Sequence, residues 1–341
     1  MRRAVTGFVR SQNLTLAVTI VLGVILLGVQ SGGGFFDGIS VTTFFTFLAV
    51  PILIGLAQMI TLAVGQLNLA VGSIGGFAAC FAGVAIQNLG FPVWIGALST
   101  VVIGAVVGLA NGWLVVATRI NGFIVTLATM TILLGGQYAL VGTRTISSNQ
   151  WPEISALGKS SVLGVPSIFL IAIAVAVIVS LFFRQTVPGR QLLASGDNAH
   201  AASLAGISND RSIVIAHGAS GLLCGVAAFI TLASLAGVNQ SVGGDWLLPS
   251  FAAPIIGGVA LTGGSVAILG TVLAATVVRI VDTARAEFQL APAWVNFVVG
   301  AVVLGTVALG RVREVRDARR AGAARAKSPA KQAKTPTGGS K

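Results

Sequence analysis

Few side chains in this sequence could carry chemistry. Its 341 residues include nine acidic residues, two histidines and two cysteines. Cys80 and Cys224 stand inside apolar runs without a CxxC pair or the spacing of metal ligands, so we expect both to be small buried hydrophobic residues. The sequence has no HExxH segment, no nucleophile elbow and no cluster of histidines and carboxylates. We therefore predict that the protein is not an enzyme and has no catalytic residues, no metal site and no cofactor of its own.

The segment LGKSS at 157–161 comes nearest to a nucleotide-binding motif. A phosphate-binding loop needs another glycine five residues before Gly158, and the sequence has Glu153 at that position. We interpret the similarity as chance.

Polar side chains inside the apolar runs are more informative. Each of them raises the free energy of the folded protein unless it has a partner or lines a water-filled cavity. The amides and the imidazole in such runs are Gln58, Gln66, Asn68, Asn111, Gln137, His217 and Asn296. We predict a translocation path lined by Gln66, Asn68, Ser73, Asn111, Gln137 and His217. Uncharged amides suit a neutral polyol better than an ion, which would need a stronger field of charge.

Two of the polar positions also have a structural interpretation. A histidine hydrogen-bonded to a neighbouring helix is the alternative for His217. Arg279 and Asp282 are spaced i, i+3 near a helix end, and this spacing predicts a local ion pair.

The elements that would hold these residues are apolar helices. The chain is 55% hydrophobic and 9% charged, and it contains 44 glycines. Its mean hydropathy is +0.93. Runs of about 20 apolar residues can cross a membrane as a helix. They predict about ten spans, at 13–30, 41–64, 69–88, 92–117, 122–142, 162–183, 212–236, 246–262, 266–284 and 291–310. The fold class is therefore an all-α polytopic membrane protein with Gly-rich broken or re-entrant segments. The first span lacks a convincing cleavage site, and we expect it to be retained.

The loops predict the orientation, because cytoplasmic loops keep positive charge. With ten spans, one side collects Arg2, Arg3, Arg10, Arg119, Arg184, Arg190, Arg211 and the basic residues from 311 onward. The other side keeps only Arg144, Lys159 and Arg285. Both termini are therefore expected in the cytoplasm, with a short segment at 1–12 and a transmembrane domain at 13–310.

The basic tail at 311–341 has no large apolar residue after Val315, so we expect it not to fold alone. No aromatic residues are interleaved with its charges, so we expect it to lie against anionic membrane lipid rather than to bind nucleic acid.

One polar break and one long inner loop stand out. The break is GQLNLAVGS at 65–73, whose glycines and amides could form a broken helix beside the path; a simple turn between two spans is the alternative. The inner loop is 184–211, where NAHAASLAGI predicts a short helix capped by Asp197 or Asn198. We expect this helix to be a docking element.

Rows of small residues, such as Gly104, Gly108 and Gly112, predict close helix packing.

Four segments resemble the permease subunits of bacterial ABC sugar importers of the ribose, xylose and arabinose type, in the same order and with the same spacing. They are GQLNLAVGS, NGFIVTLATMTILLGGQYALVGTRTIS, GRQLLASGDNAHAASLAGI and FAAPIIGGVALTGGSVAILGT. The resemblance extends over about residues 40–310. It implies a multi-pass protein of the bacterial cytoplasmic membrane, working as a dimer with a second permease copy. The implied partners are an ATPase subunit that binds the ATP and an extracytoplasmic sugar-binding protein.

The resemblance also assigns the docking surface for the ATPase to Asp197, Asn198, His200, Leu204, Gly206 and Ile207. The family usually has an aspartate where this chain has Asn68, a glutamate at His200 and an arginine at Ser203. A related importer for amino acids or nucleosides is the first alternative. An ATP-independent secondary transporter or channel is the second, although it would need no docking helix and would place ionisable groups along its path.

Overall fold

The computed structural model describes residues 2–289, 291, 297, 300, 301 and 304. The predicted last span at 291–310, together with Asn296, lies almost wholly outside the described residues, and the basic tail at 311–341 lies outside them entirely. The first compact unit of the chain ends at Val303 and contains every element below.

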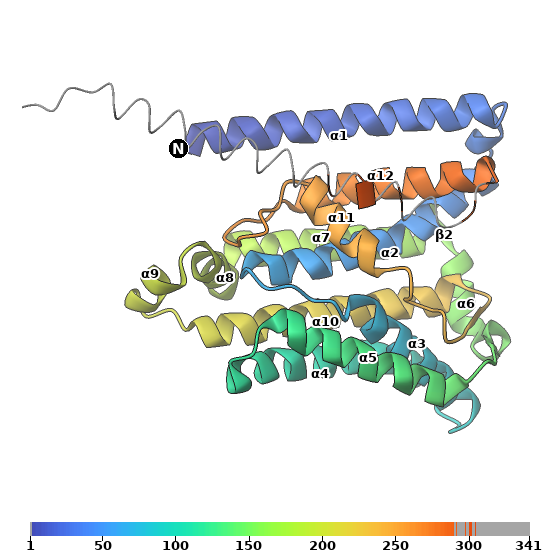
Figure 1. Ribbon diagram of the computed structural model, residues 1–341. Helices are drawn as coiled ribbons and strands as arrows, with labels where there is room; N and C mark the ends of the chain where they lie inside the picture. Colours follow the sequence, from blue (N-terminus) through green and yellow to red (C-terminus); the bar gives the residue numbers. More distant parts are fainter. Residues whose placement is uncertain (1, 290, 292–296, 298–299, 302–303, 305–341) are drawn as a thin grey trace, which may run out of the picture. The chain divides into compact units, whose positions relative to one another are not determined.

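The described residues are mostly helical (Figure 1). The helices are α1 Arg2–Gln30, α2 Gly38–Ala63, α3 Val71–Gln87, α4 Val93–Thr118, α5 Gly122–Val141, α6 Pro152–Lys159, α7 Ser167–Gln185, α8 Val187–Asp197, α9 Ala199–Leu204, α10 Asn209–Ser234, α11 Leu247–Ile256 and α12 Ile268–Glu287. Two short 3-10 helices are η1 Gly34–Phe36 and η2 Ser148–Gln150. Two antiparallel pairs of short strands are β1 Ile146–Ser147 with β4 Gly237–Val238, and β2 Ser161–Val162 with β3 Val165–Pro166.

Six of the described helices are long and apolar enough to cross a membrane, namely α1, α2, α4, α5, α7 and α10. Two more, α3 and α11, are apolar but shorter. The prediction of an all-α membrane protein is confirmed. The count of ten spans and the cytoplasmic position of both termini stay predictions.

Two predicted spans are shorter as helices than the sequence suggested. The span expected at 246–262 is helical only over Leu247–Ile256, and a turn follows it. Gly258 there has φ +95, a left-handed conformation that favours glycine and ends the helix. The span expected at 69–88 is helical only from Val71. Each short helix is preceded by a non-helical segment, 64–70 before α3 and 235–246 before α11.

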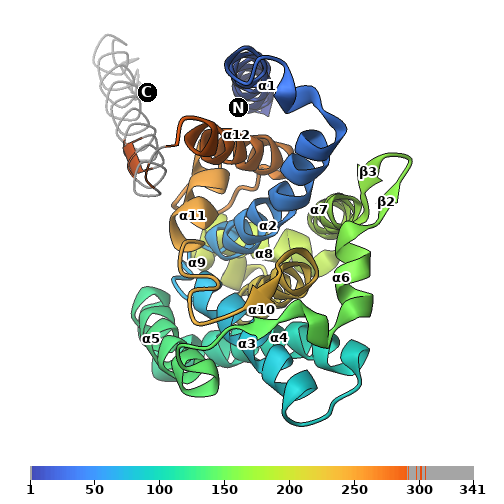
Figure 2. The ribbon, with the colours of Figure 1, turned by 90° about the vertical axis from the view of Figure 1, so that its right-hand side faces the viewer.

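Helix α2 occupies the centre of the first unit, with α7, α10, α11 and α12 around it (Figure 2). Its residues from Ile52 to Ala63 are all buried. Helices α4 and α10 pack backbone to backbone through glycines. A Cβ atom on Gly104 would overlap the carbonyl oxygen of Gly221, and one on Gly108 would overlap that of His217. The predicted role of these glycine rows in close helix packing is confirmed.

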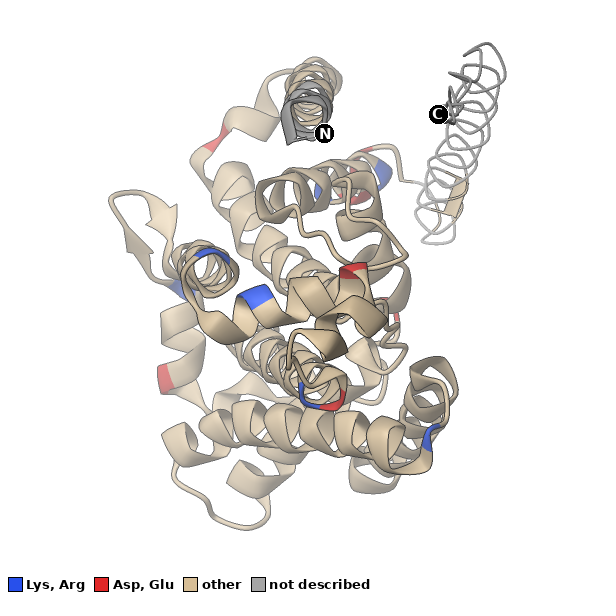
Figure 3. Cartoon of the chain, turned by 90° about the vertical axis from the view of Figure 1, so that its left-hand side faces the viewer, with Lys and Arg blue, Asp and Glu red and all other residues tan. Residues whose placement is uncertain are grey.

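The connections gather at two ends of the helices (Figure 1). We call them the α9 end, which holds α8 and α9, and the α6 end, which holds α6 and the strands. Figure 3 looks from the side of the α9 end and shows that charged residues are few and scattered along the chain. The loop arginine at this end is Arg119, whereas Arg144 and Lys159 stand in the connection at the α6 end. The positive-inside rule would place the α9 end in the cytoplasm.

Candidate functional site

The first non-helical segment, 64–70, is held by side chains from three helices. Asn68 is fully buried; its amide nitrogen donates to the hydroxyl of Ser220 at 3.0 Å, and its amide oxygen accepts from the backbone N–H two residues on, also at 3.0 Å. The amide of Gln58, oriented to satisfy both contacts, donates to the carbonyl of Asn68 at 2.8 Å and accepts from its N–H at 3.2 Å. The hydroxyl oxygen of Thr126 accepts a hydrogen bond from the backbone N–H of Leu69 at 3.1 Å. The break is therefore a fixed part of the core rather than a surface turn.

Gln66 and His217 lie against the start of α5. A Cβ atom on Gly122 would overlap the amide oxygen of Gln66 and would lie 3.5 Å from Nε2 of His217. His217 is fully buried, and neither ring nitrogen has a hydrogen-bond partner among the described residues. The hydrogen bond expected from His217 to a neighbouring helix is thus not seen in this part of the chain.

The other predicted path residues are buried in helix contacts. The hydroxyl of Ser73 donates to the carbonyl of Ala70 at 3.1 Å, within the start of α3. Asn111 of α4 accepts from the hydroxyl of Thr129 of α5 at 2.6 Å. Gln137 of α5 is fully buried as well. The structure therefore distributes the six predicted residues over segment 64–70 and four helices, α3, α4, α5 and α10, and their role in translocation stays a prediction.

The second non-helical segment, 235–246, runs along α3. The amide nitrogen of Gln137 donates to the carbonyls of Asn239 at 3.2 Å and of Val242 at 3.0 Å. The thiol of Cys80 donates to the same Asn239 carbonyl at 3.2 Å. The backbone of this segment can approach α3 closely because Gly76 has no side chain. A Cβ atom at this position would overlap the carbonyl oxygen of Val242.

A cavity of about 500 Å³ lies beside this second segment. Its walls are the middle of α2, the last turns of α10, the second half of α12, the start of α11 and the segment itself. The uncharged polar side chains in its wall are Thr231, Ser234, Asn239 and Ser241. The charged ones are Asp245, Arg279, Asp282 and Arg285. None of the six predicted path residues lines this cavity.

Three of the four charges form a linked group on α12. Arg279 Nη1 lies 2.6 Å from one carboxylate oxygen of Asp282, and Arg285 Nε lies 3.3 Å from the other. The predicted ion pair of Arg279 and Asp282 is confirmed. The guanidinium of Arg279 also stands 5.8 Å from the ring centroid of Phe44 and 5.4 Å from that of Phe47 on α2. This contact fixes the arginine between two helices.

Asp245 is the fourth charge, and it differs from the others. No side chain among the described residues gives its carboxylate a hydrogen bond or an ion pair. Desolvation raises the pKa of Asp245 above its ordinary value, a backbone hydrogen bond opposes this rise in part, and the negative charge of Asp282 adds to it. Sequence reasoning missed this residue because it considered only polar side chains inside the apolar runs, and Asp245 stands just before the run expected at 246–262. The available signal was an acidic residue directly before a short apolar helix.

The docking element predicted in loop 184–211 consists of two helices, α8 and α9. Pro188 stands in the first turn of α8, where its missing N–H removes no helical bond. Asn198 caps α9 by accepting from the N–H of Ala201 at 2.9 Å, so the cap is Asn198 rather than Asp197.

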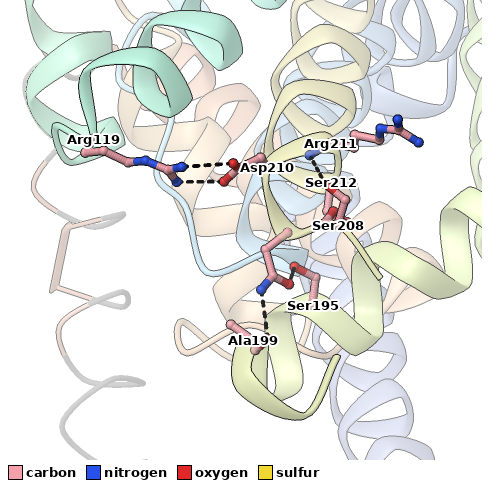
Figure 4. A network of polar contacts seen from close by, with 8 residues as sticks. Arg119, Ser195, Ala199, Ser208, Asp210, Arg211 and Ser212 are labelled. Atoms are coloured by element: carbon pink, nitrogen blue, oxygen red, sulfur yellow. Dashed lines mark hydrogen bonds and ion pairs between the residues drawn. The ribbon is translucent and has the colours of Figure 1, made fainter. Parts of the chain in front are cut away.

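Figure 4 shows how this element is fixed to α10. Asn209, the first residue of α10, accepts from the hydroxyl of Ser195 on α8 at 2.7 Å and donates to the carbonyl of Ala199 on α9 at 2.8 Å. Nearby, Arg119 and Asp210 join the end of α4 to the start of α10 at 2.8 Å. A displacement of α8 or α9 would therefore act directly on α10.

Helix α9 is shorter than the sequence predicted, and its last residue is exposed. Leu204 is 78% exposed, and His200 is exposed as well. The expectation that Leu204 and Ile207 share a helix is wrong, because α9 ends at Leu204. Gly206 has φ +79, which lets the chain turn back, and Ile207 then lies half-buried beyond the turn.

The apolar helices define a membrane protein, and comparison with known proteins identifies it further. Residues 40–307 match the family of the branched-chain amino acid transport system permease component. The chain belongs to this family. No solved structure matches the chain.

Three relatives show the range of named functions. The chain is 29% identical over 266 residues, 78% of its length and 77% of the relative's, to the autoinducer 2 import system permease protein LsrC of Enterobacter sp. (strain 638). It is 27% identical over 310 residues, 87% of its length and 85% of the relative's, to the fructose import permease protein FrcC of Rhizobium meliloti. It is 28% identical over 305 residues, 86% of its length and 89% of the relative's, to the fructose import permease protein FruG of Bifidobacterium longum (strain NCC 2705).

These matches confirm the predicted resemblance to permease subunits of bacterial ABC sugar importers and the prediction of a multi-pass protein of the bacterial cytoplasmic membrane. The relatives are named as permeases and not as enzymes.

Proposed function

We propose that this chain is the membrane permease of an ATP-driven importer for a monosaccharide. An extracytoplasmic binding protein delivers the sugar, a separate ATPase subunit binds and hydrolyses the ATP, and a second permease copy completes the translocation path. The observation that carries the proposal is the exposed α9 with Leu204 at its tip, in a chain that belongs to a permease family.

The geometry of the α9 end supports ATPase coupling. A permease driven by another subunit needs a rigid element that seats in a groove of that subunit. Helix α9 is short, its start is capped by Asn198, and Asn209 links it to α8 and α10. Helix α10 packs along α4 and α2 in the core. The path from the surface to the core is therefore made of direct contacts, without a long unstructured linker.

Import of a branched-chain amino acid is the second candidate, since the family description carries that name. The relatives quoted above favour the sugar, because two of them are named fructose permeases. Uptake of labelled fructose and of labelled leucine by cells that depend on this permease would separate the two candidates.

Replacement of Leu204 by Asp tests the proposed docking. A charge would enter a packed interface, and we expect recovery of the proposed ATPase partner to fall at least about tenfold in co-purification. Sugar uptake should be lost, while the amount of permease in the membrane should not change. Leu163→Asp is the matched control, because Leu163 is fully exposed in the β2–β3 connection at the opposite end.

A Gly206→Pro variant provides a second test, since proline cannot adopt the φ of +79 found there. Normal co-purification and normal uptake with both Leu204→Asp and Gly206→Pro would show that the ATPase docks elsewhere.

A further inference from the structure

Three parts of the chain that are far apart in sequence meet at the α9 end through closely packed backbone. They are the last two residues of α8, the end of α2 with Gly65 after it, and the loop 257–267 between α11 and α12 (Figure 1). The loop has the sequence GGVALTGGSVA and belongs to one of the four segments that resemble sugar permeases. We call this contact the glycine junction.

Gly196 is the point at which α8 touches both of the other parts. A Cβ atom on Gly196 would overlap the carbonyl oxygen of Ala63, the last residue of α2, and would lie 2.7 Å from the backbone nitrogen of Gly264. Gly196 is the second-last residue of α8, and α9 begins at Ala199. No side chain separates these backbones, so a shift of α8 must displace the atoms packed against it.

The loop is bonded to the same carbonyl group. The N–H of Gly264 donates to the carbonyl of Ala63 at 2.9 Å and so satisfies one of the carbonyls that the end of α2 leaves free. A Cβ atom on Gly263 would lie 2.8 Å from the carbonyl oxygen of Gly196 and 2.9 Å from the backbone nitrogen of Gly65. The φ values of Gly263 and Gly264, +95 and +76, are left-handed and favour glycine.

The junction leads to two regions in the interior. Segment 64–70 follows Ala63 directly and holds two of the predicted path residues. At the other end of the loop, a Cβ atom on Gly270 of α12 would overlap the carbonyl oxygen of Gly257. The loop is therefore packed tightly against the start of α12, and both α11 and α12 form walls of the cavity.

We propose that the glycine junction transmits the movement of the docked α9 to segment 64–70 and to the loop, with Gly196 as the positioning residue, and this assignment rests on the proposed function. Close packing alone would need α8 to touch only one neighbour. Gly196 instead touches two parts that are bonded to each other, so the three parts move as one body. Asn209 makes a separate connection, from α8 and α9 to α10.

The first test is Gly196→Ala in the complex of the permease with the ATPase that co-purifies with the parent chain. The added methyl group cannot fit against Ala63, whereas the exposed side of α9 is unchanged. We expect the ATPase to be recovered as with the parent, and the uptake of labelled fructose per permease molecule to fall about tenfold. Gly135→Ala is the matched control, because Gly135 is also helical and no atom lies within 4 Å of a Cβ placed there.

A second variant approaches the junction from the loop. A Cβ atom on Gly264 would lie 2.7 Å from the Cα atom of Asp197, so Gly264→Ala should reproduce the effect of Gly196→Ala. Gly142→Ala is the matched control for backbone strain. Gly142 has φ +58, and no atom lies within 4 Å of a Cβ placed there.

Hydrogen exchange separates transmission from a loss of stability, and it needs no solute. In the parent complex, trapping of nucleotide with ATP and vanadate should change the exchange of residues 64–70 relative to the nucleotide-free complex. This change should be at least about fivefold smaller in Gly196→Ala and should persist in Asn209→Ala, which breaks only the connection to α10. A variant that is merely less stable would exchange faster in both nucleotide states and keep the difference between them.

Three results would overturn the assignment of Gly196. They are uptake by Gly196→Ala and Gly264→Ala equal to that of their controls, an equal response of residues 64–70 to nucleotide in Gly196→Ala and the parent, or loss of the ATPase from Gly196→Ala. If Leu204→Asp loses the ATPase while Gly196→Ala transports normally, the proposed function stands and the junction does not transmit the movement.

Discussion

Two segments of this protein leave helical geometry before a short apolar helix, and they differ in what their polar groups face. Segment 64–70 precedes α3, and the side chain of Asn68 and the backbone of Asn68 and Leu69 are turned into the core, where Gln58, Thr126 and Ser220 bond to them. Segment 235–246 precedes α11. Gln137 and Cys80 hold one edge of it, and Asp245 on the segment lines the cavity.

The difference shows that a polar residue at a helix break can have either of two tasks. An amide such as Asn68 can replace the backbone hydrogen bonds that the missing helical turn would have supplied. The carboxylate of Asp245 on the second segment has no side-chain partner among the described residues, and this residue lines the cavity instead. Substitutions of these two residues should therefore differ in their effect on stability.

The largest expected effect is on the contact between the second segment and α3. Gly76→Leu would force a side chain into the carbonyl of Val242 and the amide of Gln137, where even a Cβ atom does not fit. We expect a loss of about 3 kcal/mol in the free energy of unfolding, measured by denaturant titration of the purified protein. Gly135→Leu is the control, because no atom lies within 4 Å of a Cβ placed there. Equal stability of the two variants would contradict the close packing of this segment.

The next effect concerns the first segment. Asn68→Leu removes the partner of Ser220 and of the buried N–H of Ala70, and we expect a loss of about 2 kcal/mol. Asn88→Leu is the control, since Asn88 is exposed after α3. If Asn68→Leu unfolds like the parent but no longer transports, Asn68 belongs to the path, as the sequence suggested, and not to the scaffold.

Much of the scaffold can be predicted from the sequence, because the helices follow from long apolar runs and the glycine rows from a repeat of four. The break at 65–73 can be found as well, since glycines and amides interrupt an apolar run. The roles of its amides cannot be found, because the partner of Asn68 is Ser220, 152 residues away. A hydrogen bond between such distant residues has no local sequence signal.

The cavity cannot be predicted from the sequence either, because residues far apart in the chain form its walls. Its wall combines α2 with α12 and with a loop, and Arg279 reaches Phe44 and Phe47 across that gap. The local pair of Arg279 with Asp282 is predictable from i, i+3 spacing, whereas the position of Asp245 near this pair requires the fold.

A smaller effect is expected at Gln137, which holds the second segment from α5. Gln137→Leu leaves the carbonyls of Asn239 and Val242 without this donor, but it also removes an amide oxygen that has no partner among the described residues. We expect a net loss of about 1 kcal/mol. Hydrogen exchange of residues 237–246 should increase, and the exchange of residues 64–70 should not. Gln87→Leu, at the exposed end of α3, should change neither.

The smallest effect on stability is expected at Asp245, and its sign should be opposite. Partial burial and the charge of Asp282 raise the pKa of Asp245, so the folded protein disfavours the ionised carboxylate relative to the unfolded chain. The stabilising contribution of a group with a raised pKa is present at acidic pH, where it is protonated in both states, and is lost as the pH rises through the folded-state pKa. Asp245→Asn should therefore be as stable as the parent or slightly more stable at neutral pH, and this difference should shrink as the pH falls. Thermal unfolding of the two proteins across the acidic range would measure it, with Glu153→Gln as the control. A clear loss of stability in Asp245→Asn at neutral pH would mean that Asp245 supports the second segment, as Asn68 supports the first, and that the two breaks have the same task.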